Sequence, residues 1–125
     1  VPAVKQGLKP NSISTDLHTG SMNGGMKDII NIMSKFINMG LSTQEVIQIT
    51  TWDPAKYIQR RDLGHLSVGA VADVTLLNLR EGDFGFIDTQ GKRMKGNQKL
   101  ECELTLREGN VVYDLNGLAS ESWKQ

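Results

Sequence analysis

Asp16 is the residue of this chain whose type and position best suit catalysis. It stands near the end of residues 13–17, a short apolar–polar run that is typical of a β-strand. Side chains alternate between the two faces of a strand, so Ser14, Asp16 and His18 would share one face. In parallel α/β architectures the catalytic groups lie at the C-terminal ends of the strands. We therefore expect this strand to deliver the Asp16 carboxylate to a site; the alternative is an aspartate that only stabilises a turn.

A glycine-rich loop follows Asp16 and ends at Gly25. Gly24 and Gly25 allow backbone conformations that other residues resist, and Met22 offers a flexible apolar contact. We expect these three residues and His18 to form a loop that closes over a substrate. An ordinary connection between a strand and a helix is the alternative. No Gly-Lys-Ser or Gly-Lys-Thr sequence follows, so the loop is not a phosphate-binding loop.

Three helices are expected between positions 26 and 60. The first is amphipathic, ends at Gly40 and repeats apolar residues at i, i+3, i+4 and i+7 spacing. The second begins at a capping box formed by Ser42 and Glu45 and runs to about Thr50. The third is expected to run from about Pro54 to Arg60, because the capping residue Asp53 is followed by proline at the first helical position. The apolar stripe of the first helix consists of Met26, Ile29, Ile30, Met33, Phe36 and Ile37.

From position 63 onward, glycines recur and the helical periodicity disappears. Strands are expected at residues 71–79 and 84–88, and residues 100–107 alternate as a half-buried antiparallel strand does. A turn with glycine at its centre then leads into residues 111–113 and completes a hairpin. One face of the strand at 100–107 is expected to be apolar, which makes its cysteine a buried and inert thiol. That face would hold Leu100, Cys102, Leu104 and Leu106.

The composition is that of a soluble globular domain. The chain has 125 residues, of which 38% are hydrophobic and 22% charged, and its 14 basic and 14 acidic residues balance. It has no basic cluster for nucleic acid, no apolar run near the ~20 residues of a membrane span and no signal peptide. A single cysteine fits a reducing compartment. We expect a cytoplasmic protein that binds neither nucleic acid nor membranes. Because the chain does not begin with Met, we also expect a piece of a longer protein.

Three segments resemble one enzyme family, in the same order. Residues 14–18, STDLH, look like the end of the eighth strand of a barrel with its aspartate. Residues 50–55, TTWDPA, are similar to the segment where the chain leaves that barrel. Residues 63–77, LGHLSVGAVADVTLL, look like the start of the C-terminal half of a β-sandwich. The chain thus resembles the C-terminal part of the amidohydrolase superfamily, closest to its dihydroorotase-like and deacetylase branch.

This resemblance implies an α/β plus β fold in two parts. Residues 1–62 would form the last strand and helices of a TIM-like barrel, and residues 63–125 the C-terminal part of a composite β-sandwich. We expect His65, just before the sandwich segment, to be structural. We expect Asp73 to hydrogen-bond backbone amides in a tight strand connection and to have no part in catalysis.

The resemblance also implies the chemistry. Family members are metal-dependent hydrolases of amide and related C–N bonds, in which the strand-eight aspartate contacts the metal and takes up the proton of the bound water. Asp16 matches that position, and it is both the catalytic and the metal-contacting candidate. The intact enzyme would act on a small-molecule amide with a divalent metal, which we expect to be zinc. The family's other metal ligands are absent from this chain, so we expect the chain alone to be inactive and to bind little metal.

A second hypothesis is a standalone structural or interaction module that keeps the family's C-terminal fold without its chemistry. The coding sequence upstream of Val1 separates the two hypotheses, because a His-x-His pair after a strand there favours the enzyme. A start codon beside Val1 favours the module. In either case we expect a homo-oligomer, since an apolar helix face of this size rarely stays in water.

Overall fold

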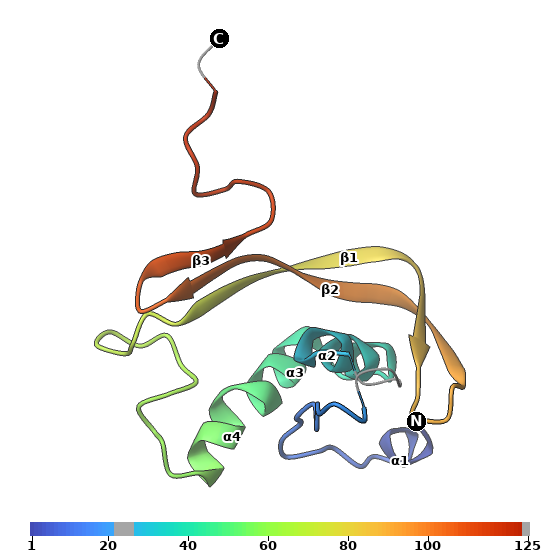
Figure 1. The fold of residues 1–125 in the computed structure, drawn as a ribbon. Coiled ribbons are helices and arrows are strands. Elements are labelled where there is room, and N and C mark those ends of the chain that lie inside the picture. The colour runs from blue at the N-terminus through green and yellow to red at the C-terminus, as the bar shows by residue number, and fades with distance from the viewer. Residues whose placement is uncertain (22–26, 124–125) are drawn as a thin grey trace.

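The fold is a three-stranded antiparallel sheet with helices against one of its faces (Figure 1). The computed structural model describes residues 1–21 and 27–123. The sheet has the strand order β1-β2-β3, and the segment after β3 runs away from the helices. No helix in the described ranges is long and apolar enough to cross a membrane. The elements, in chain order, are α1 (Pro2–Lys5), α2 (Ile29–Asn38), α3 (Thr43–Thr50), α4 (Trp52–Tyr57), β1 (Val74–Ile87), β2 (Arg93–Arg107) and β3 (Asn110–Asp114).

Helix boundaries follow the local signals closely for α2 and α3. Asp28 caps α2, with its carboxylate accepting the backbone N–H of Asn31 at 2.6 Å. The chain leaves α2 through Gly40, whose φ of 110° suits a residue without a Cβ. The predicted capping box of α3 is confirmed, with reciprocal hydrogen bonds between Ser42 and Glu45.

The third helix begins earlier than predicted and is shorter. Thr51 ends α3 and directly precedes α4, which starts at Trp52 and ends at Tyr57. Pro54 therefore lies inside the first turn of α4 and not at its first position. Proline is tolerated there because the N–H groups of a first helical turn have no acceptor within the helix.

The sheet is longer than the sequence pattern predicted. The two strands expected at 71–79 and 84–88 form one strand, β1, interrupted by an irregularity in its pairing with β2 between Glu81 and Phe84. β2 begins at Arg93, seven residues before the predicted start at 100, because it follows β1 along its whole length. The predicted hairpin into β3 is confirmed. Its turn residues, Glu108 and Gly109, both have positive φ values (51° and 80°), as a tight hairpin turn requires.

A β-bulge in β2 overturns the expected single apolar face. Leu77 of β1 pairs with Cys102, but its neighbour Leu76 pairs with Leu104, so Glu103 is an extra residue on β2. Paired residues share a face of the sheet, and successive residues lie on opposite faces. Cys102 therefore faces the helices while Leu104 lies on the outer face beside Leu76, which is 50% exposed. The prediction that Leu100, Cys102, Leu104 and Leu106 share one face is wrong, because the extra residue reverses the alternation.

One hydrophobic core joins the helices to the sheet. Val46 of α3 is completely buried, and Leu100 of β2 is 2% exposed. The core thus contains residues from both of the expected parts, 1–62 and 63–125. The division of the chain between these parts stays a prediction. The core cluster consists of Met33, Ile37, Leu41, Val46, Ile49 and Leu100.

Ser34 is the buried polar residue at the centre of the contact between α2 and β2. Its side chain is fully buried. The Ser34 hydroxyl donates to the Ile30 carbonyl oxygen at 2.7 Å and accepts the backbone N–H of Leu100 at 2.9 Å. β3 pairs with β2 only between Leu104 and Arg107. The N–H of Leu100 therefore lies on a part of β2 that β3 leaves uncovered, and Ser34 satisfies it.

Asn38, one turn further along α2, extends this contact. Its Oδ1 accepts the backbone N–H groups of Asn97 at 2.8 Å and Gln98 at 3.2 Å, and its Nδ2 donates to the Gln98 carbonyl oxygen at 2.6 Å. Gly96 leaves the space that this side chain needs. A Cβ at that position would lie 2.4 Å from Asn38 Oδ1.

We predict that Ser34→Ala lowers the free energy of unfolding by about 1–3 kcal/mol, because it leaves the buried N–H of Leu100 without an acceptor. Urea denaturation of the wild-type and variant chains measures the change. Ser12→Ala is the control, since Ser12 is exposed and the expected change there is within about 0.5 kcal/mol. Equal stabilities of the two variants would contradict the role given to Ser34.

Candidate active site

Asp16 directly follows an extended segment that Ile13 attaches to α3, and it does not lie on a strand. The expected strand at residues 13–17 is absent, because the sheet that the described residues form contains β1, β2 and β3 alone. A parallel-type strand needs neighbouring strands, and the described chain offers none at this place. The backbone N–H of Ile13 instead donates to the Ile49 carbonyl oxygen at 3.1 Å, and the Ile13 side chain packs against the core.

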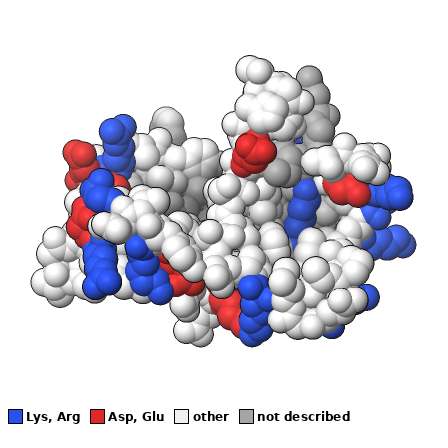
Figure 2. All heavy atoms as spheres, turned by 90° about the horizontal axis from the view of Figure 1, so that it is seen from below, with Lys and Arg blue, Asp and Glu red and all other residues white. Residues whose placement is uncertain are grey.

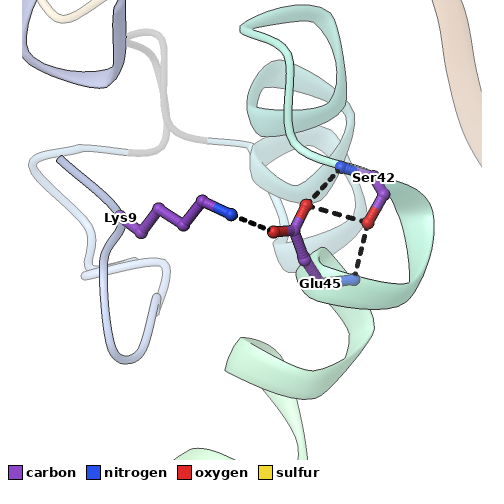
Figure 3. A network of polar contacts seen from close by, with 3 residues as sticks. All are labelled: Lys9, Ser42 and Glu45. Carbon is purple, nitrogen blue, oxygen red and sulfur yellow. Dashed lines mark hydrogen bonds and ion pairs between the residues drawn. The ribbon is translucent and has the colours of Figure 1, made fainter. Parts of the chain in front are cut away.

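A network of polar contacts ties the start of this segment to the first turn of α3 (Figure 3). Lys9 pairs with Oε1 of Glu45, while Oε2 of Glu45 accepts the Ser42 backbone N–H at 2.9 Å and the Ser42 hydroxyl at 2.8 Å. Lys9 and Ile13 thus contact the two ends of one helix. The ammonium group of Lys9, followed by the Ser42 donors, lowers the pKa of Glu45 from 4.5 to about 2.

The backbone of Asp16 is in the left-handed region, with a φ of 47°. This conformation costs a residue with a Cβ about 1–2 kcal/mol, although aspartate tolerates it better than most. It also ends the extended run, so the expected common face of Ser14, Asp16 and His18 does not form. Asp16 is exposed, and its carboxylate makes no hydrogen bond or ion pair with another described residue. Among the described residues, nothing competes for its oxygens.

His18 stabilises the loop that follows Asp16. Its Nδ1 accepts the backbone N–H of Gly20 at 3.1 Å, and the side chain is exposed. This contact fits a residue of the predicted substrate loop, while the contact with a substrate stays a prediction. The other members of that loop, Met22, Gly24 and Gly25, lie outside the described residues.

Asp16 is a single carboxylate and not a complete metal site. Among the described residues, no three His, Cys, Asp or Glu side chains gather closely enough to hold a metal ion. An aspartate oxygen is nonetheless an ordinary zinc ligand, and three protein ligands are usual at catalytic zinc. Asp16 alone would supply one oxygen ligand to such a site.

The motif segments at 50–55 and 63–77 pack against each other. Gly64 has a φ of 75°, and a Cβ there would lie 2.6 Å from the Thr51 carbonyl oxygen. The rings of Trp52 and His65 meet edge to face with centroids 5.5 Å apart. His65 also contacts the backbone, with Nε2 3.1 Å from the Arg61 carbonyl oxygen. These contacts support the structural role expected for His65.

The hydrogen bond expected between Asp73 and backbone amides is confirmed. Its carboxylate accepts the backbone N–H of Glu108 at 2.8 Å, in the turn between β2 and β3. The neighbouring Ala72 carbonyl oxygen accepts the N–H of Gly109 at 2.9 Å. The segment before β1 therefore supports the hairpin turn, and the carboxylate is already occupied.

An apolar groove that the sequence did not indicate lies between α2, α3, β1 and the loop before β1. Its volume is about 660 Å³. Cys102 lines it and is half-buried, which corrects the expectation of a fully buried thiol. Asp16 and His18 are not among its lining residues. The groove includes Ile30, Met33, Ile47, Leu63, Leu66 and Leu77.

Charges of both signs are interspersed on the face shown in Figure 2. Two close pairs of opposite charge lie on α4 and shortly after it. Lys56 and Asp53 are 2.7 Å apart, and so are Arg60 and Asp62. The Arg60 guanidinium, as the largest cause, lowers the pKa of Asp62 to about 2.

The comparison with known families agrees with the sequence resemblance. The sequence model of the Amidohydrolase family matches residues 1–112. The chain belongs to the amidohydrolase family. It is similar to a deacetylase of Brucella anthropi, with 37% identity over 99 residues that cover 79% of this chain and 25% of the relative. It is also 37% identical over 89 residues to a deacetylase of Agrobacterium fabrum, covering 71% of this chain and 22% of that protein.

Solved structures show the same relationship in three dimensions. An adenine deaminase matches with a TM-score of 0.83 and 27% identity, and a dihydroorotase with a TM-score of 0.81 and 30% identity. Each match covers 90% of this chain and 31% of the solved chain. The predicted membership of the amidohydrolase superfamily is confirmed. The chain spans between about a fifth and a third of the length of these proteins.

We predict that Gly64→Ala destabilises the chain by at least about 1 kcal/mol more than Gly69→Ala, because a side chain at 64 meets the Thr51 carbonyl. Gly69 is a matched control. Its φ of 90° is equally left-handed, but a Cβ there has nothing within 4 Å. Thermal unfolding of both variants measures the difference. Equal losses would mean that only the backbone conformation matters.

A second prediction concerns Lys9 and pH. Because the pKa of Glu45 is lowered to about 2, its ionised form stabilises the fold above the ordinary pKa of 4.5, and this contribution is lost as pH falls from 4.5 towards 2. Lys9→Ala should raise the midpoint of the Glu45 titration, which carbon NMR of the Glu45 carboxyl follows. Lys5→Ala is the control. The same midpoint in both variants would refute the pairing of Lys9 with Glu45.

Proposed function

We propose that this chain is the C-terminal segment of a metal-dependent amidohydrolase that hydrolyses amide or cyclic-amide C–N bonds. In this proposal residues 1–62 end a TIM-like barrel, and residues 63–125 form the C-terminal part of a composite β-sandwich. The observation that carries the proposal is the exposed carboxylate of Asp16, which lies within the family match and has no hydrogen-bond partner among the described residues. The STDLH motif supports its assignment as the family's catalytic aspartate.

The names of similar proteins support hydrolysis of C–N bonds. The relatives are deacetylases, and the solved structures are an adenine deaminase and a dihydroorotase. The chain covers only 22–31% of these proteins. That coverage supports the view that the rest of a catalytic site lies on other parts of a longer protein. A small-molecule amide is the substrate class that follows, in a protein that works in the cytoplasm.

Asp16 would act as one metal ligand and as the proton carrier. Its carboxylate oxygen is the one described donor at the site, so further ligands must come from outside the described residues. When bound, a divalent metal, for which we propose zinc, supplies Lewis-acid activation of water and of the amide carbonyl. The Asp16 carboxylate takes up the proton of the attacking water at one oxygen and passes it to the departing nitrogen.

The non-catalytic module remains the alternative function. Ile47, Tyr57 and Ile58 are exposed apolar side chains on and directly after α3 and α4, which supports self-association. A homo-oligomer stays a prediction under either function. The two functions differ in what Asp16 does, and the variant below separates them.

We predict that Asp16→Asn, in the protein as its gene encodes it, lowers kcat about 10²- to 10⁴-fold, because the amide cannot accept the proton. The assay follows zinc-loaded protein with a panel of N-acetylated amino acids and cyclic ureides. Asp83→Asn is the control, since Asp83 is an exposed carboxylate of β1. Full activity of Asp16→Asn would remove the catalytic role, and inactivity of the wild type towards every amide would favour the module.

A further inference from the structure

Ser21 makes the side-chain contacts that close the turn carrying Asp16. Its hydroxyl oxygen lies 3.1 Å from the Asp16 carbonyl oxygen and 3.1 Å from the His18 carbonyl oxygen. The same oxygen accepts the backbone N–H of His18 at 3.0 Å. The backbone N–H of Ser21 donates to the His18 carbonyl oxygen at 2.9 Å. The Ser21 hydroxyl thus acts as donor and acceptor within the turn formed by residues 16–21.

The turn receives no comparable support from the rest of the described chain. Within the described ranges, residues 14–21 form hydrogen bonds only with one another. The nearest preceding hydrogen bond to another element is that of Ile13 with Ile49 of α3. Leu17 donates its N–H to the Thr15 hydroxyl at 3.1 Å, which orders only the residues beside Asp16. Ser21 is half-buried although residues 16–20 are exposed. Ser21 is thus the residue whose side chain joins the end of the turn to its start.

We propose that Ser21 is a positioning residue for Asp16. Its hydroxyl holds the turn closed, keeps Asp16 at positive φ and so fixes the direction in which the Cα–Cβ bond of Asp16 leaves the backbone. This inference rests on the proposed function of Asp16 as proton carrier. Positive φ limits the region that the Asp16 carboxylate reaches by rotation about its side-chain bonds, so a contact that fixes this backbone conformation keeps the carboxylate near the site.

The chemistry of the contact sets what can replace serine. The group at position 21 must donate to a carbonyl and accept an N–H from the same short side chain. Threonine provides the same hydroxyl on Cβ, and alanine provides neither function. Ser21→Thr should therefore preserve the turn, and Ser21→Ala should open it.

The first test uses NMR of the gene-encoded protein and needs no substrate. A residue at positive φ has a short distance between its amide and α protons, which gives a strong intraresidue NOE. We expect this NOE to be strong for Asp16 in the wild type and in Ser21→Thr, and to fall to the level of its extended neighbours in Ser21→Ala. A strong NOE in Ser21→Ala would overturn the proposal, whatever the activity.

The second test separates positioning from the proposed function. With the zinc-loaded protein, Ser21→Ala should lower kcat about 10- to 100-fold while KM and bound zinc stay within threefold, and Ser21→Thr should restore most of kcat. Ser12→Ala, at an exposed serine, is the control. Loss of activity in Asp16→Asn but not in Ser21→Ala refutes the positioning role alone. Full activity in Asp16→Asn refutes the proposed function itself.

Discussion

The rest of the structure depends on the docking of α2 onto β2. Ser34 and Leu100 are joined by a hydrogen bond across 66 positions of sequence, and Asn38 and Gln98 across 60. These bonds satisfy backbone groups of a strand that β3 leaves uncovered, and they do so next to the most buried side chains of the sheet. A buried amide without an acceptor is costly, so the helix and the strand fix each other's position.

The position of the candidate site depends on this core. α3 packs in the same cluster as α2, and the segment before Asp16 is attached to both ends of α3, through Lys9 and Ile13. Beyond Ile13 the hydrogen bonds of the described chain stay within the turn itself, and the Ser21 hydroxyl makes three of these contacts. In the account proposed above, α3 sets where the segment runs, and the Ser21 hydroxyl maintains the backbone conformation of Asp16.

Local signals in the sequence predicted the local features well. The Ser42 and Glu45 capping box, the stop at Gly40, the hairpin turn and the backbone contact of Asp73 were all readable, because each depends on residues a few positions apart or on one side chain in a motif. The resemblance of three short segments was enough to identify the family. Asp16 was selected by the same motif, and its role stays a prediction.

Features that depend on distant partners could not be read from the sequence. The extra residue Glu103 shifts the residues that follow it in β2 to the opposite face of the sheet. The regular alternation of apolar and polar residues in this stretch gives no sign of such a bulge. The segment at 13–17 has the composition of a strand but lacks strands to pair with, so it lies along a helix. Ser34 looks like an ordinary polar residue in a helix until β2 is placed beside it. The most direct test of the whole account is a crystal structure of the gene-encoded protein grown with zinc. We predict a carboxylate oxygen of Asp16 at about 2.0–2.2 Å from the metal. A bound zinc with Asp16 outside its ligand shell would contradict the account.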